Sequence, residues 1–136
     1  MRQSIPLFRS IQTGLDLNGP TLSMQQQPVS ASTSVAAGTI TFTGIGTAIF
    51  PSSQTSRNTN TGTVTHQWHQ VGVGPLTDGA NISGSTTTTL TLTGLTSPDD
   101  DGNQYFCRIG YDPNALSPNA INEPFDSAIA TTVVAP

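Results

Sequence analysis

Residues Asp99–Cys107 read DDDGNQYFC, a run of three carboxylates that passes through a glycine into an aromatic residue and the only cysteine of the chain. Three interpretations of this stretch are open at the outset. The carboxylates suit a cation loop, because hard cations prefer oxygen ligands. The cysteine suits a reactive thiol, and the change from polar to apolar residues suits a structural corner. Each interpretation implies a different kind of function, and the rest of the sequence shows which of the three is favoured.

The composition indicates one β-rich domain that binds no nucleic acid. The chain has 136 residues, of which 9% are charged and 34% hydrophobic, with a net charge of −4. Soluble proteins average roughly 25% charged residues, so solubility here depends on neutral polar side chains such as threonine, which favours strands. Four scattered arginines and no lysine cannot form the basic surface that nucleic acid requires.

The compartment is expected to be a reducing cytoplasm. A single cysteine cannot form an internal disulfide. Pro6, Arg9 and Gln12 interrupt the apolar residues near the start before a secretory segment can form. No apolar run has the length of a membrane span, so we expect no membrane partner.

Short alternating runs predict an all-β sandwich of about seven antiparallel strands. In GSTTTTLTLTGL, Leu90 and Leu92 share one face and the intervening threonines share the other, the period of two that strands show. Trp68, the only tryptophan, is the expected centre of the core. The predicted strands cover about residues 21–27, 30–35, 39–45, 63–71, 86–93, 104–111 and 128–134.

The first twenty residues differ from the rest and are predicted to be an extended N-terminal arm, with the sandwich over 21–136. They are apolar but show no strand or helix period, and prolines and a glycine interrupt them. The arm could add a strand or strap to its own sandwich, or dock on another subunit. In the second case the partner-binding residues are Arg2, Ile5, Leu7, Phe8, Arg9 and Ile11.

The spacing of seven residues resembles the immunoglobulin fold, in which a core tryptophan precedes an L-x-L strand and a D-x-G-x-Y-x-C corner. The residues that carry this resemblance are Trp68, Leu90, Leu92, Leu95, Asp101, Tyr105 and Cys107. It implies that the Tyr105 hydroxyl bonds back to the backbone of the preceding turn. It also places Asn103 where the pattern has a glycine, a position that favours positive φ.

The departures from this immunoglobulin pattern are equally informative. Gly44 stands where the resemblance would place the second cysteine, so Cys107 is expected to be a reduced thiol packed near Trp68 and Gly44. Two connections are long, 48–62 and 112–124, and the fold would place both at the same end as the N-terminus. Aromatic residues in or beside them are the predicted contact surface. These residues are Phe50, Tyr111 and Phe125.

Two phrases, TGLDLNGPTLS at 13–23 and NAINEPFDSAIA at 119–130, are similar to phrases in immunoglobulin-like domains of tailed-phage virion proteins, particularly those of cyanobacterial phages. The resemblance implies a structural or decorating virion protein, assembled in the host cytoplasm, whose partners are other virion proteins. The alternative is an adhesin, or the N-terminal part of a fibre, that binds a host-surface glycan or protein. Edge strands and the apolar arm also favour a homo-oligomer.

Candidate chemistry in the chain is weak, and we expect no enzyme, cofactor or metal site. Adjacent carboxylates on extended chain point to opposite sides, so DDDG suits a polar turn better than a calcium loop, with Asp99 and Asp100 in solvent. An inward Cys107 lacks the electropositive surroundings of a nucleophile. His66 and His69 are three apart on a strand, so they face opposite sides and cannot share a metal.

Overall fold

The computed structural model describes residues 21–49, 63–112 and 124–136, and within these ranges every regular element is a β-strand. The all-β prediction is therefore confirmed. In chain order the strands are β1 (Thr21–Gln26), β2 (Ala31–Thr33), β3 (Gly38–Thr43), β4 (Ile45–Ile49), β5 (Thr63–Gln70), β6 (Gly74–Pro75), β7 (Ile82–Ser83), β8 (Thr89–Leu95), β9 (Gln104–Asp112), β10 (Phe125–Asp126) and β11 (Ala130–Val134).

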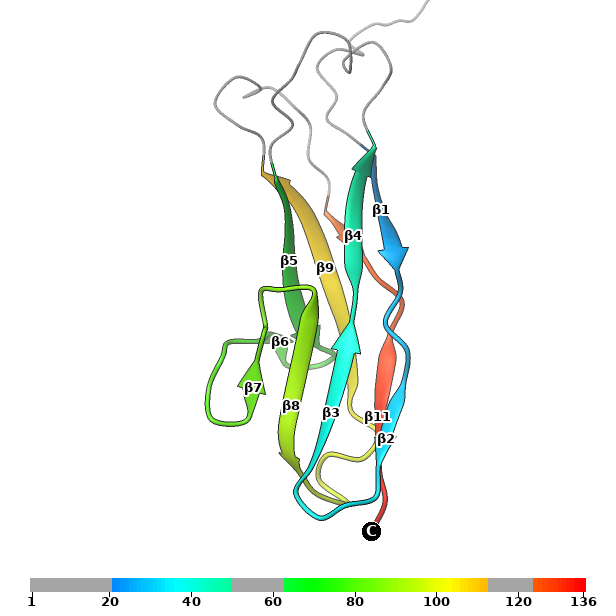
Figure 1. The fold of residues 1–136 in the computed structure, drawn as a ribbon, viewed down its shortest axis with the longest axis vertical. Coiled ribbons are helices and arrows are strands. Elements are labelled where there is room, and N and C mark those ends of the chain that lie inside the picture. Colours follow the sequence, from blue (N-terminus) through cyan, green and yellow to red (C-terminus); the bar gives the residue numbers. More distant parts are fainter. Residues whose placement is uncertain (1–20, 50–62, 113–123) are drawn as a thin grey trace, which may run out of the picture.

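The strands form two layers (Figure 1). One layer, the β9 sheet, has the order β2-β11-β9-β5-β6, with β10 also paired to β9. The other layer consists of the β8 sheet, with the order β3-β8-β7, and of the β1–β4 pair, which continues it because β4 follows β3 directly after Gly44. The pairings in the described chain are antiparallel except that of β2 with β11, which is parallel.

The core lies between the layers and is built around Trp68, as predicted. Trp68 and Leu90 are fully buried, and the Phe42 ring lies 6.4 Å from the Trp68 ring and 5.6 Å from the Tyr105 ring, centroid to centroid. Leu90 and Leu92 point inward from β8 while its threonines face outward, so the predicted alternation is confirmed. Burial of these large side chains is the main stabilising contribution in such a fold.

The predicted strands at 86–93 and 39–45 differ from the observed ones in their bounds. The run at 86–93 begins only at Thr89, because the Thr87 hydroxyl donates to the carbonyls of Gly84 and Thr89 and closes a turn. The run at 39–45 ends at Thr43 and is followed by β4, a strand that the sequence analysis missed.

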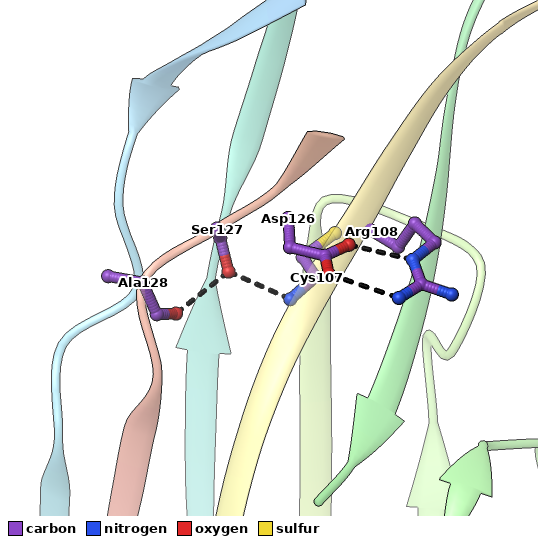
Figure 2. Close-up of polar contacts among 5 residues, drawn as sticks. All are labelled: Cys107, Arg108, Asp126, Ser127 and Ala128. Atoms are coloured by element: carbon purple, nitrogen blue, oxygen red, sulfur yellow. Dashed lines mark hydrogen bonds and ion pairs between the residues drawn. The ribbon is translucent and has the colours of Figure 1, made fainter. Parts of the chain in front are cut away.

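The last predicted strand, 128–134, begins only at Ala130 as β11, and a short strand that was not predicted, β10, precedes it, with Ser127 between the two. Figure 2 shows the Ser127 hydroxyl accepting a hydrogen bond from the Cys107 backbone N–H at 2.8 Å and donating to the Ala128 carbonyl at 2.8 Å. A side-chain oxygen therefore replaces a strand carbonyl at this point, which satisfies the buried N–H where the ladder is interrupted.

The sandwich has two unequal halves along its long axis. We call the half that contains β8 the lower half and the half that contains the β1–β4 pair the upper half, as they stand in Figure 1. At the upper end, Thr21 pairs with Ile49 and Thr63 pairs with Asp112. The strand ends that flank 1–20, 50–62 and 113–123 therefore gather at one end, while the described chain finishes at the other.

Candidate interaction surfaces

The stretch DDDGNQYFC is a structural corner that fastens the C-terminal strand. A carboxylate oxygen of Asp101 accepts a hydrogen bond from the Val134 N–H at 2.8 Å. The Thr132 hydroxyl donates to the Asp100 carbonyl at 2.6 Å, and the Gly102 N–H donates to the Thr132 carbonyl at 2.8 Å. The Asp100 side chain accepts from the Thr96 N–H at 2.8 Å. The polar-turn interpretation is confirmed, because these carboxylates bind backbone.

Two details of the corner differ from expectation. The positive φ belongs to Gly102, at 83°, and not to Asn103. Asp99 and Asp100 were both predicted to lie in solvent. Asp99 is exposed, but Asp100 is half-buried and its side chain accepts a hydrogen bond. Burial raises the pKa of the Tyr105 hydroxyl, and the Asn103 side chain acts on it in the opposite direction. The residue with positive φ, Gly102, thus lies one position before Asn103, where the immunoglobulin pattern has its glycine.

The carboxylates do not converge on a common point. In the described part of the chain, no group of three or more histidine, cysteine, aspartate or glutamate side chains is arranged to hold a metal ion. Asp78 also binds locally, because its carboxylate accepts from the Ser85 N–H at 2.9 Å, and this bonding to Ser85 lowers its pKa. These acidic groups serve turns and strand ends.

Cys107 is an inert thiol in the core. It is fully buried, and a Cβ added to Gly44 would lie 3.4 Å from its Cβ and 3.3 Å from the Trp68 ring, so the predicted Gly44, Trp68 and Cys107 neighbourhood is confirmed. Burial raises the pKa of the thiol to about 11. The thiolate that nucleophilic chemistry needs is therefore scarce at neutral pH.

The two histidines face opposite sides of β5, as predicted. His66 points into the sandwich, where its Nε2 accepts a hydrogen bond from the Gly46 N–H of β4 at 3.1 Å. Burial lowers the His66 pKa, which favours the neutral form that can accept this bond. His69 points outward and stacks on Phe106, with 5.0 Å between the ring centroids.

An outward cluster on the β9 sheet extends from this stack. The Arg108 guanidinium binds Asp126 with two hydrogen bonds of 2.7 and 3.0 Å, as Figure 2 shows, and also lies 5.6 Å from the centre of the Phe106 ring. Arg108 lowers the pKa of Asp126, and burial and Arg108 lower that of His69. An exposed pair of this kind contributes about 1 kcal/mol or less.

This outward cluster was not predicted from the sequence. Part of it could have been predicted from the alternation on β9. Tyr105 and Cys107 face inward there, so Phe106 and Arg108 face outward. The partners His69 and Asp126 come from distant segments, so nothing local in the sequence pairs them with β9.

The predicted contact aromatics are not equivalent in the structure. Tyr111 is only 2% exposed in β9, so its prediction as a surface residue is wrong: its side chain points inward with Ile109 and Cys107. Phe125 in β10 is 40% exposed and remains available for contact. Phe50 and the arm residues lie outside the described residues. The arm residues are Arg2, Ile5, Leu7, Phe8, Arg9 and Ile11.

Similarity to known proteins is found at the level of the fold and not of the sequence. The sequence matches no protein-family profile and no curated protein, and no helix in the described ranges has the length and apolar character of a membrane span. Among solved structures, immunoglobulin domains 1–4 of Sidekick-1 match with a TM-score of 0.54 and 21% identity over 85% of this chain. Murine CRIg matches with a TM-score of 0.51 and 14% identity over 85% of this chain and 99% of its own.

A third match, extracellular domains 3–5 of Drosophila OTK, has a TM-score of 0.51 and 18% identity over 85% of this chain and 32% of the OTK chain. The chain spans about a quarter of the Sidekick-1 chain that it matches, since it covers 24% of it. Identities this low establish architecture only. Together with the strand pairing described above, they establish that the chain has an immunoglobulin-like β-sandwich fold.

Proposed function

We propose that this chain is a non-enzymatic structural or decorating protein of a tailed-phage virion, which docks through its arm and displays the sandwich on the particle. The observation that carries the proposal is the gathering, at the upper end, of the strand ends that flank the arm and both long connections. One end is thereby supplied with three long segments for contact with neighbours.

The virion assignment is supported by the two phrases at 13–23 and 119–130 that resemble phage virion domains. A sandwich that replaces the inter-sheet disulfide with Gly44 and a buried Cys107 is compatible with assembly in a reducing host cytoplasm. Docking by the arm would be driven by apolar burial. Four large side chains contribute on the order of 6–12 kcal/mol before ordering costs. These side chains are Ile5, Leu7, Phe8 and Ile11.

The test is incorporation into particles during infection by a phage that lacks its own copy of the gene. We expect a chain with Leu7→Asp and Phe8→Asp to stay folded and to be lost from purified particles. Ile129→Ser, which removes an exposed apolar side chain from the sandwich, is the matched control and should incorporate normally. Wild-type occupancy of the arm variant would contradict the docking role.

An adhesin is the second candidate, and the exposure of Phe125 beside a long connection favours it. A glycan array and a host-cell binding assay with the purified chain separate the two functions. Saturable binding that Phe125→Ala abolishes would favour the adhesin, whereas a structural protein should show none. The reading frame beyond Pro136 would show whether the chain is the first part of a fibre.

A further inference from the structure

One edge of β4 carries no strand within the described ranges. On one side β4 pairs with β1 over Thr21–Gln26, and no described strand pairs with its other side. The β8 strand begins only at Thr89, level with the end of β3, so that side of β4 opens toward β5 in the upper half (Figure 1). Among the described strands, β4 is therefore the edge of its layer in this half.

The backbone groups along this edge can be followed one by one. The Gly44 N–H donates to the Thr88 carbonyl at 2.8 Å, at the point where β8 begins. Two residues further on, the Gly46 N–H donates to the His66 side chain and not to a strand. Because alternate residues of an antiparallel strand direct their backbone groups to the same side, Ala48 presents its N–H and C=O to this edge too.

The sequence of β4 does nothing to discourage pairing. Proteins protect free edges with charged residues or prolines, and β4 reads IGTAI, which contains neither. Ile49 at its end is 58% exposed. An unpaired edge of this kind is a template for an extended segment of another chain.

We propose that this edge receives the arm of a second copy of this chain, paired antiparallel with Ile5 opposite Ala48 and Leu7 opposite Gly46. The proposal rests on the docking role proposed above for the arm and names its receptor. Gly46 exchanges the His66 side chain for a carbonyl of the incoming strand.

The alternation of the arm fits this register. Residues opposite Gly46 and Ala48 direct their side chains to the inward face, as those two positions do. Ile5 and Leu7 would thus cover the half-buried Val64 of β5. Pro6, which has no N–H, would direct its nitrogen away from β4 to the solvent side, where a proline is tolerated on an edge strand.

Geometry favours a second copy over the chain's own arm. Thr21 pairs with Ile49, so the arm leaves the sandwich on the β1 side of β4. To reach the other side it would have to cross the connection that leaves Ile49 for Thr63, and connections rarely cross at one edge of a sheet. The chain between Leu7 and Thr21 can span up to about 45 Å, enough to reach a neighbouring copy.

The test is sedimentation velocity of the full chain over a range of concentrations, with one variant for each side of the contact. Leu7→Asp places a charge in the arm, and Ala48→Pro removes the N–H that faces this edge without removing a bond to β1. We expect the wild-type chain to self-associate and each variant alone to be monomeric. A mixture of the two should form a heterodimer, because the Ala48→Pro chain keeps its arm and the Leu7→Asp chain keeps its edge.

Recovery of association in the mixture excludes misfolding as the cause of the monomeric variants, because an unfolded variant could not restore it. The emission of the buried Trp68 checks the fold of each variant separately. Ile129→Ser is the control and should associate like the wild-type chain. A monomeric wild-type chain, variants that still associate, or a mixture that does not would each overturn the pairing. If the wild-type chain is monomeric while the arm variant still fails to enter particles, the pairing fails and the proposed function stands.

Discussion

The two halves of the sandwich are built differently. In the lower half, the three-stranded β8 sheet packs on the β9 sheet, and the corner at Asp100 and Asp101 fastens β11. In the upper half, among the described strands, only the β1–β4 pair faces β5, β9 and β10, and the hydrogen bond described between β4 and β5 is that of His66 to Gly46. We therefore expect most of the stability to come from the lower half, where both layers are complete, whereas the described residues of the upper half leave one edge of β4 without a strand.

The expected difference in stability between the two halves is tested most directly by truncating one apolar side chain in each half. Leu90→Ala in the lower half should lower the free energy of unfolding by about 2–5 kcal/mol, because Leu90 is fully buried and a cavity remains. Val64→Ala in the upper half should cost about 1 kcal/mol, since Val64 is only half-buried. Urea denaturation followed by Trp68 emission measures both, and equal losses would contradict the contrast.

A disulfide between the layers would strengthen the boundary of the two halves. A Cβ at Gly44 would lie 3.4 Å from that of Cys107, close to the 3.5–4.5 Å typical of disulfides. Under oxidising conditions Gly44→Cys should therefore form the bond and stabilise the chain by about 2–4 kcal/mol, less the strain of its contact with Trp68. Thiol titration and unfolding with and without reductant check this, and a thiol that remains free would refute the geometry.

Loosening the corner should have a smaller effect. Asp101→Ala leaves the Val134 N–H without its acceptor, which should cost about 1–3 kcal/mol. Asp99→Ala is the matched control, because Asp99 is exposed, and its stability should be unchanged. If the two variants are equally stable, the corner does not fasten β11.

The smallest effect concerns the histidine bond of the upper half. The folded-state pKa of His66 lies below 6.5, so the unfolded chain binds more protons and the free energy of unfolding should fall as the pH drops below about 6.5. His69 adds a slope of the same sign. Asp78 and Asp126 have lowered pKa values, so their contributions stay constant between pH 5 and 7.

His66→Gln keeps an acceptor for the Gly46 N–H but does not titrate, so it should flatten part of the slope between pH 5 and 7, and His69→Gln should flatten the remainder. Urea denaturation at several pH values measures this. An unchanged slope in the double variant would mean that neither histidine is responsible.

The lower half was largely predictable from the sequence, and the upper half was not. Trp68, Leu90 and Cys107 follow a spacing that strand alternation enforces, so their burial followed from the order of residues. The pairing of Arg108 with Asp126, and of His66 with the Gly46 N–H, depends on which distant strands become neighbours. Tyr111 was predicted to end the strand at 104–111 and to lie on the contact surface beside the long connection, but it shares the inward face of β9 with Cys107 and Ile109.

The parallel pairing of β2 with β11 has a mechanical consequence. The described chain enters at the upper end with Thr21 and leaves at the lower end after Val134, so tension along the long axis pulls β11 lengthwise past β2. The bonds of this pair, together with those of the corner to Thr132 and Val134, then bear the load simultaneously. Stretching the described part of the domain along its axis therefore loads these bonds in shear and all at once, and not one after another.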